Sequence, residues 1–182
     1  MWDLRRGEQV QYMTPDGEGY LKGEVTALLL VGGGKTLAVG YSNGMVRCYD
    51  AARGGSPLVS LMGHKGAVGC LAGDADASGL AAGKGGAMLL CSGGNDTDVV
   101  VWDLVAERGL CRLKGHRDAV TSVRFIPRPP SAVAASFLGS GGGGSAALGL
   151  AGGGGLGSGG RGRLLCSASK DAVVKVGHSL QE

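Results

Sequence analysis

Aromatic side chains and long apolar runs are both scarce in this sequence. Phe, Trp and Tyr together make up 4% of the residues, so a folded core must be built mainly from Val, Leu, Ala and Cys. No apolar run approaches the roughly 18 residues that a membrane-spanning helix needs. The opening segment Met1–Arg6 has no apolar h-region, so we expect no secretory signal peptide. These absences predict a soluble intracellular protein with no membrane partner.

Neither the charge balance nor the cysteine pattern indicates a specific chemistry. The 18 basic and 15 acidic residues give a net charge of +3, too weak on its own to argue for a nucleic-acid surface. No Cys-x-x-Cys pair occurs, and the cysteines are odd in number: Cys48, Cys70, Cys91, Cys111 and Cys166. Four of them lie in apolar runs, where free thiols are typically buried. We therefore expect reduced core cysteines of a cytosolic or nuclear protein, with no metal site.

Glycine, in contrast, is strongly over-represented. It accounts for 38 of the 182 residues, about a fifth, against a usual share of roughly 7%. Gly, Ser and Ala dominate residues 127–162, which cannot bury enough apolar area to offset the entropy of ordering them. We expect a flexible insertion in a surface loop, where extra length costs little free energy. A second Gly- and Ala-rich loop is expected at about residues 73–86.

One stretch organises the rest of the chain. Residues 94–103 comprise a turn that carries an Asp, then a β-branched run, then Trp-Asp. Gly-His pairs stand upstream and downstream, at Gly63-His64 and Gly115-His116. This arrangement is typical of a β-propeller blade, in which each repeat holds four strands in roughly 40–45 residues. The sequence therefore predicts an all-β fold.

Short apolar runs bounded by Gly, Asn and Pro mark the expected strands. A first full repeat is predicted to have strands at 25–31, 36–41, 45–49 and 58–62. The second and best-formed repeat is predicted to have strands at 68–71, 88–92, 98–102 and 110–113. The third is predicted to have strands at 120–126, 164–169 and 172–176. Trp2-Asp3-Leu4 ends an earlier repeat, and a strand at 9–13 and a turn at 14–19 are expected to follow it.

The predicted architecture is a partial β-propeller with about two complete blades and parts of two more. Its blades occupy residues 1–126, the flexible insertion 127–162, the strands of the last partial blade 163–176, and a tail 177–182. A propeller needs roughly four to eight blades to close. Because no outer strand is expected after residue 176, we interpret the chain as a fragment or a truncated gene model with a non-native tail.

Four residues of the second repeat are predicted to form a structural latch. In a blade, the His of the Gly-His loop, a Ser on the second strand, the Asp of the hairpin turn and the Trp of the third strand can form a hydrogen-bonded chain. Here these residues are His64, Ser92, Asp96 and Trp102. A partial latch in the third repeat comprises His116, Ser167 and Asp171, with Gly177 where Trp is expected. The first repeat has Asn43 and Tyr49 and lacks a matching Gly-His.

Two enzymatic interpretations compete with this structural one. The Ser-His-Asp part of the latch could be a catalytic group, but the Trp and the repeat spacing account for all four residues at once. Residues 31–36, ending in Lys35-Thr36, resemble a phosphate-binding loop. That motif needs a Gly at the position of Leu29 and a helix afterwards, whereas a strand is predicted here. We therefore expect no catalytic residues, no cofactor and no enzymatic activity.

With these residues in view, the chain resembles the WD-repeat (WD40) family. Two passages, residues 37–44 and residues 96–103 continued by 109–121, more specifically resemble the N-terminal propeller of the tandem-propeller WD-repeat subunits of UtpB. UtpB is part of the U3 small nucleolar ribonucleoprotein, or small-subunit processome. Residues 2–10 fit an earlier blade of that propeller. The resemblance covers about residues 1–128 and 163–176.

That resemblance implies a non-enzymatic scaffold of the nucleus and nucleolus, acting in small-subunit ribosomal RNA processing and ribosome biogenesis. The implied partners are other protein subunits of a large ribonucleoprotein assembly, together with U3 small nucleolar RNA and pre-ribosomal RNA. The sequence departs from this family in lacking a second propeller and a C-terminal helical domain. The alternative is a WD-repeat adaptor of another assembly, a ubiquitin-ligase receptor or a signalling scaffold, because one fold hosts many functions.

Overall fold

The computed structural model describes residues 2–9, 23–73, 88–127 and 163–178, and the regular elements in these ranges are β-strands. Within these ranges, no helix is long and apolar enough to cross a membrane. Several predicted features lie outside the described residues: the strand residues 10–13, the turn at 14–19, the loop residues 74–86, the insertion residues 128–162 and the tail residues 179–182.

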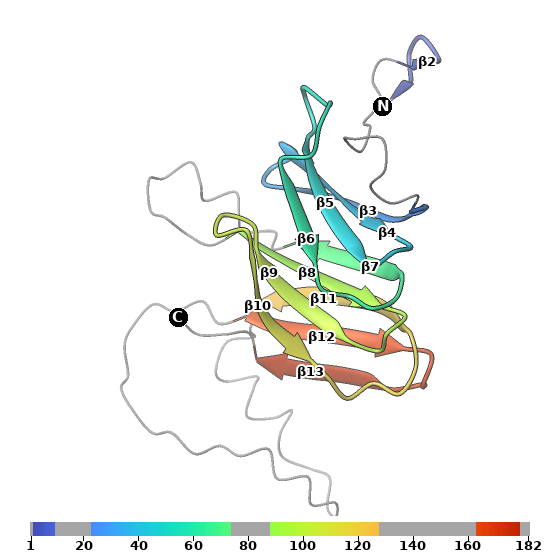
Figure 1. Cartoon of the computed structure of the whole chain (residues 1–182), viewed down its shortest axis with the longest axis vertical. Coiled ribbons are helices and arrows are strands. Elements are labelled where there is room, and N and C mark those ends of the chain that lie inside the picture. Colours follow the sequence, from blue (N-terminus) through green and yellow to red (C-terminus); the bar gives the residue numbers. More distant parts are fainter. Residues whose placement is uncertain (1, 10–22, 74–87, 128–162, 179–182) are drawn as a thin grey trace, which may run out of the picture.

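Three antiparallel sheets follow one another along the chain and lie side by side, and we call them blades 1, 2 and 3 (Figure 1). Blade 1 contains β3 (Val25–Val31), β4 (Thr36–Tyr41), β5 (Met45–Asp50) and β6 (Val59–Met62). Blade 2 contains β7 (Val68–Gly73), β8 (Leu89–Gly94), β9 (Val99–Asp103) and β10 (Arg108–Leu113). Blade 3 contains β11 (Val120–Pro127), β12 (Arg163–Ser169) and β13 (Val174–His178). A two-stranded hairpin of β1 (Trp2–Asp3) and β2 (Glu8–Gln9) precedes them.

Each strand of the three blades lies where the sequence predicts it, within two residues at either end. Two boundaries need correction. Pro127, expected to lie in the insertion, is the last residue of β11 and pairs with Arg163, because a strand end tolerates the missing N–H of proline. Gly177, expected to begin the tail, continues β13 and pairs with Leu165, because the main chain alone makes the ladder.

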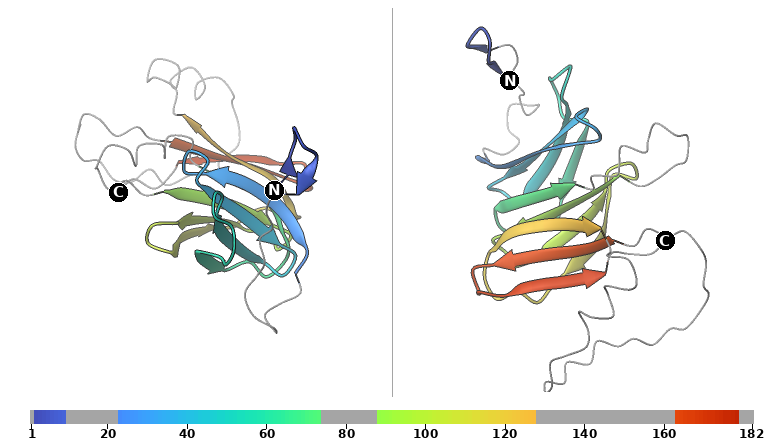
Figure 2. Two further views of the ribbon diagram at one scale, coloured as in Figure 1. Left: turned by 90° about the horizontal axis from the view of Figure 1, so that it is seen from above. Right: turned by 180° about the vertical axis from the view of Figure 1, so that it is seen from behind.

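The first strands of the three blades lie next to one another. Strand β7 contacts both β3 and β11, and Figure 2 shows these strands grouped while the later strands of each blade lead away. A β-bulge recurs at the same place in all three first strands, at Thr26, Gly69 and Thr121. In blade 1 the Thr26 hydroxyl donates to the carbonyl of Val68 at 2.6 Å, so the bulge residue joins blade 1 to blade 2.

Two apolar layers hold the blades together. The layer between blades 1 and 2 consists of Val31, Ala38, Val46, Cys48, Leu61, Val68, Leu71, Leu90, Val100, Trp102 and Leu104. The layer between blades 2 and 3 consists of Ala72, Cys91, Val99, Val101, Val120, Val123 and Leu165. The third strands of blades 1 and 2 contribute alternate residues to the first layer, Val46 and Cys48 from β5 and Val100 and Trp102 from β9, as the pleat of a strand requires. This packing of successive twisted sheets is a partial β-propeller, as predicted.

Candidate functional site

The four latch residues of blade 2 lie in one hydrogen-bonded chain. Trp102 Nε1–H donates to Ser92 Oγ at 2.8 Å. Ser92 Oγ lies 2.8 Å from His64 Nε2, and His64 Nδ1 lies 2.8 Å from Asp96 Oδ1. The backbone N–H of Lys65 donates to the other carboxylate oxygen, Asp96 Oδ2, at 2.8 Å. The structure thus brings together the loop before β7, the β8–β9 hairpin and the third strand.

The direction of the hydrogen bond between His64 and Asp96 follows from the charge of Asp96. Burial by itself raises the pKa of this carboxyl group, but the N–H of Lys65 and the ring of His64 outweigh it and keep the pKa below its ordinary value. The ionised carboxylate only accepts, so Nδ1–H of His64 donates to it. His64 Nε2 and the Ser92 hydroxyl share the next hydrogen bond of the chain. Ser92 has no exposed surface. Its oxygen is therefore shielded from any substrate, and the polar groups satisfy one another.

Blade 3 repeats three of the four contacts. His116 Nε2 lies 2.8 Å from Ser167 Oγ, and His116 Nδ1 lies 3.0 Å from Asp171 Oδ2. The backbone N–H of Arg117 donates to the same oxygen of Asp171 at 2.8 Å. That N–H is the main cause that lowers the pKa of Asp171 to about 2. The three members predicted for the partial latch therefore lie together.

Strand register identifies what stands in the Trp position of the other two blades. In blade 2, Trp102 pairs with Leu90, two residues before the latch Ser92. In blade 3 the corresponding pair is Gly177 with Leu165, two residues before Ser167, so Gly177 occupies the Trp position, as the spacing predicts. No side chain there can donate to the serine.

Blade 1 uses a different contact. Tyr49 stands in the Trp position, paired with Leu37. Its hydroxyl lies 2.7 Å from the hydroxyl of Tyr41, and the two rings belong to a buried cluster. Burial, followed by the Tyr49 contact, raises the pKa of Tyr41. The guanidinium of Arg47 lies 5.5 Å from the centre of the Tyr41 ring.

All three hairpins between the second and third strands of a blade place one residue in the left-handed region. These residues are Gly44 (φ 84°), Thr97 (φ 68°) and Ala172 (φ 62°), each directly after the Asn or Asp of the turn. Gly adopts this conformation freely, whereas Thr is β-branched and rarely does so. The three turns therefore have the same geometry even where Thr97 or Ala172 takes the place of glycine. This geometry directs Asp96 and Asp171 toward their histidines.

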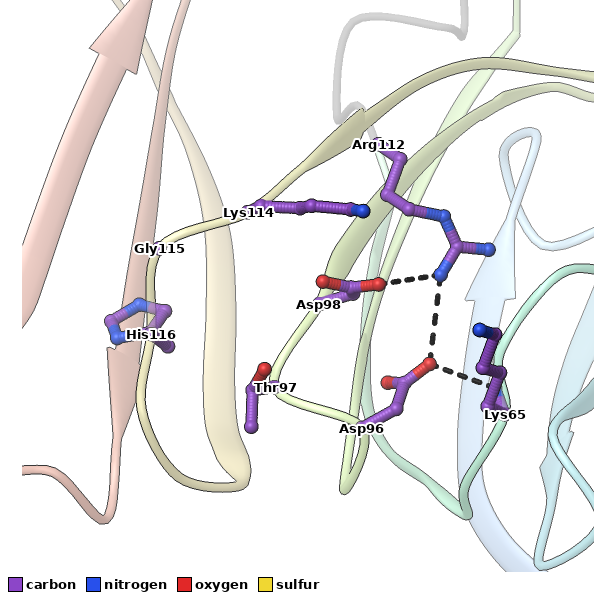
Figure 3. Close-up of a pocket in the computed structure, with 8 residues that line it drawn as sticks. All are labelled: Lys65, Asp96, Thr97, Asp98, Arg112, Lys114, Gly115 and His116. Atoms are coloured by element: carbon purple, nitrogen blue, oxygen red, sulfur yellow. Dashed lines mark hydrogen bonds and ion pairs between the residues drawn. The ribbon is translucent and has the colours of Figure 1, made fainter.

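Sequence reasoning missed Arg112, which ties the latch loop to the outer strand of blade 2. Arg112 Nη1 lies 2.6 Å from Asp98 Oδ2 and 3.6 Å from Asp96 Oδ2, and Nη2 donates to the carbonyl of Gly63. Figure 3 shows the guanidinium in contact with both carboxylates, near Lys65 and Lys114. These residues border a pocket of about 620 Å³. No sequence pattern indicated this ion pair, because it depends on how β10 lies against the latch loop.

The structure also shows where the cysteines and Lys35 lie. The five cysteines are free thiols, as expected, and burial raises the pKa of Cys48 and Cys70 to about 11. Lys35 ends the turn before β4, and a strand follows it, not the helix that a phosphate-binding loop requires.

Comparison with known proteins now identifies the repeat. Residues 55–103 match the family described as WD domain, G-beta repeat. The chain contains a WD40 repeat. The matched segment includes β6 of blade 1 and ends with β9 of blade 2, so one WD40 repeat of sequence is offset by one strand from one blade of structure.

Two plant proteins resemble the WD40 chain over more than half of its length. Both are described as guanine nucleotide-binding protein subunit beta. The protein from Nicotiana tabacum is 33% identical over 107 residues, covering 56% of this chain and 25% of the relative. The protein from Solanum tuberosum is 32% identical over 116 residues, covering 60% of this chain and 27% of the relative. The chain spans about a quarter of the length of these relatives.

Three solved structures contain a chain with the same fold. The RRP9 WD40 repeats match at a TM-score of 0.56 and 18% identity, over 86% of this chain and 36% of that one. A chain of the mitotic checkpoint complex matches at a TM-score of 0.61 and 20% identity, over 97% of this chain and 39% of that one. U3-55K matches at a TM-score of 0.54 and 24% identity, over 68% of this chain and 35% of that one. At these identities the likeness establishes the fold alone.

Proposed function

We propose that this chain is a non-enzymatic WD-repeat scaffold that acts in the small-subunit processome. The observation behind the scaffold role is the closed hydrogen-bonded chain of blade 2. It uses the polar groups of Ser92 and His64 internally, and Ser92 has no exposed surface. A serine in this setting has no access to a substrate, so the groups that resemble a catalytic triad act in folding. Binding then falls to the loops and edges of the blades.

The processome assignment rests on the two passages that resemble UtpB propellers. In the structure, residues 37–44 form most of β4 and its hairpin turn, and residues 96–121 run from the β8–β9 turn through β10 to the start of β11. The partners proposed with it are protein subunits of a large ribonucleoprotein assembly, with U3 small nucleolar RNA and pre-ribosomal RNA. The proposed location is the nucleolus. The fold shared with U3-55K is compatible with this role.

The test is purification and imaging of a tagged full chain from cells. The proposal expects the tagged chain to concentrate in the nucleolus and to recover U3 RNA well above the level obtained with the tag alone. A chain that stays in the cytosol and recovers no U3 RNA contradicts the processome role.

The alternative is an adaptor in a signalling assembly, and one observation favours it. Both curated relatives are described as guanine nucleotide-binding protein subunit beta, at 33% and 32% identity. The same purification separates the two roles. A signalling adaptor recovers other guanine nucleotide-binding protein subunits from the cytosol, whereas a processome scaffold recovers U3 RNA and processome subunits.

A further inference from the structure

Arg112 lines two pockets of blade 2. One is the charged pocket of about 620 Å³, which continues to Gly115 and His116 at the entry to blade 3 (Figure 3). The other, of about 260 Å³, is also lined by Arg112 and reaches Met62 at the end of blade 1. The guanidinium is held in place by Asp98 and the carbonyl of Gly63, so it forms a fixed wall shared by both pockets.

The charged pocket has more cationic than anionic side chains. Three cations line it, Lys65, Arg112 and Lys114, against two carboxylates, Asp96 and Asp98. Arg112 pairs with both carboxylates, and Asp96 also accepts from His64. Within the described part of the chain, the ammonium groups of Lys65 and Lys114 have no ion-pair partner, and both residues are exposed. Figure 3 shows both lysines directed toward the space around Arg112.

The second pocket is mainly apolar. Its lining includes Met62, Val100, Trp102 and Leu110. Met62 is 74% exposed, although β6 carries the buried Leu61 beside it. An exposed thioether at the rim of an apolar pocket is an adaptable contact for a partner side chain. The two pockets together therefore offer a cationic position next to an apolar one.

We propose that these adjoining pockets bind an extended peptide segment of a partner protein, an acidic residue lying between Lys65 and Lys114 and a bulky apolar residue lying against Met62. Charge complementarity favours an isolated carboxylate in the first pocket. The apolar pocket favours a protein over RNA. Single-stranded RNA binds on exposed aromatic platforms, and the two aromatic rings among the described residues that line the pockets, His116 and Trp102, are only 8% and 3% exposed. The inference rests on the proposed scaffold function and specifies the chemistry of one protein partner.

The test is fluorescence anisotropy on the full chain with short labelled probes. The first probe is a peptide in which Asp and Glu residues precede Leu-Phe-Leu. The second carries Lys in place of the acidic residues, and the third is an oligouridine RNA. The variants are K65Q/K114Q for the charged pocket and M62S for the apolar one. Matched controls are K35Q, at an exposed lysine in the β3–β4 turn, and L58S, at an exposed leucine before β6.

The expected result is binding of the acidic-apolar peptide alone. Removing both ammonium groups weakens it roughly tenfold, M62S weakens it by a similar factor, and K35Q and L58S leave it unchanged. Binding must also weaken as salt is added. The inference is overturned if no peptide binds, if the pocket variants behave like their controls, or if oligouridine binds in its place. Because this assay needs no cellular partner, its failure alongside nucleolar U3 recovery removes the peptide site alone, and the reverse outcome removes the processome role alone.

Discussion

Trp102 is the residue on which the latch of blade 2 depends most. Its ring is 3% exposed and lies 3.5 Å from the position that a Cβ of Gly109 would occupy, while its indole N–H donates to Ser92. It therefore combines apolar burial with a hydrogen bond that a smaller side chain cannot replace.

We expect Trp102→Ala to destabilise the protein by about 3–5 kcal/mol, because a cavity replaces the ring and Ser92 loses its donor. Trp102→Phe keeps most of the ring volume and should cost less, about 1–2 kcal/mol, for the lost hydrogen bond. Urea denaturation of both variants checks the order. If Trp102→Ala unfolds at the same urea concentration as the parent protein, the latch has no role in stability.

The two latch carboxylates predict how stability changes in acid. The pKa of Asp171 is lowered from 3.8 to about 2 on folding, and that of Asp96 is also lowered. A lowered folded-state pKa stabilises the folded protein above the unfolded value, and this contribution disappears as the pH falls through the folded value. We therefore expect the melting temperature to fall between about pH 4 and pH 2.

Asp171→Asn tests the same point. This variant cannot ionise at the position, so its melting temperature should be lower than that of the parent at pH 5 and should change less between pH 4 and pH 2. Parallel acid profiles for the two proteins would show that Asp171 does not contribute to the pH dependence.

How much of the site is visible in the sequence differs from residue to residue. His64, Ser92, Asp96 and Trp102 can be predicted because each occupies a fixed place in a repeat whose strand spacing is regular. The pair Arg112–Asp98 cannot, because its members lie 14 residues apart and meet only through the β9–β10 register, Asp98 directly before β9 and Arg112 on β10. Nor does any local pattern show that Arg112 also reaches Gly63.

At the scale of the element, glycine on the second strand sets how closely one blade approaches the next. A Cβ at Gly40 would lie 2.8 Å from Val68 Cγ1, and one at Gly93 would lie 2.5 Å from Val120 Cγ1. In both cases the valine is the first residue of the next blade's inner strand. The two glycines are equivalent, since each is the next-to-last residue of its strand and pairs with the third strand in the same register.

We expect Gly93→Ala to cost about 1–3 kcal/mol, because the new methyl group overpacks a closely fitted contact between blades 2 and 3. Gly177→Ala is the matched control, since nothing lies within 4 Å of its Cβ position. Thermal unfolding of the two variants should separate them. Equal melting temperatures would mean that blades 2 and 3 can move apart to accept the methyl group without a loss of stability.

At the scale of the whole molecule, blade 3 closes across a long interruption in the sequence. Strand β11 ends at Pro127 and β12 begins at Arg163, and these two residues are direct partners in the antiparallel ladder. A two-residue hairpin turn can therefore connect them without moving either strand. That residues 128–162 are an insertion stays a prediction, and Pro127 belongs to β11 instead.

We expect a chain in which Asn-Gly replaces residues 128–162 to keep the folded blades, with a melting temperature equal to or above that of the parent, because the shorter loop loses less entropy on folding. Circular dichroism and thermal melting provide the measurement. A control chain with a Gly-Ser segment of the original length should melt like the parent. Loss of the β-sheet signal in the shortened chain alone would assign a structural role to the replaced residues.

The sequence by itself determined where the strands lie and which residues form the latch, because β-branched runs, Asn-Gly and Asp-containing turns and Gly-His pairs act over short distances along the chain. Tertiary structure alone decided how the blades meet. The contact of Thr26 with Val68 spans 42 residues, and that of Arg112 with Gly63 spans 49. Such contacts depend on the twist of each sheet and the angle between sheets, which no local run of residues specifies. The pocket pair beside Arg112 arises in the same way, from side chains that three successive blades bring to one edge.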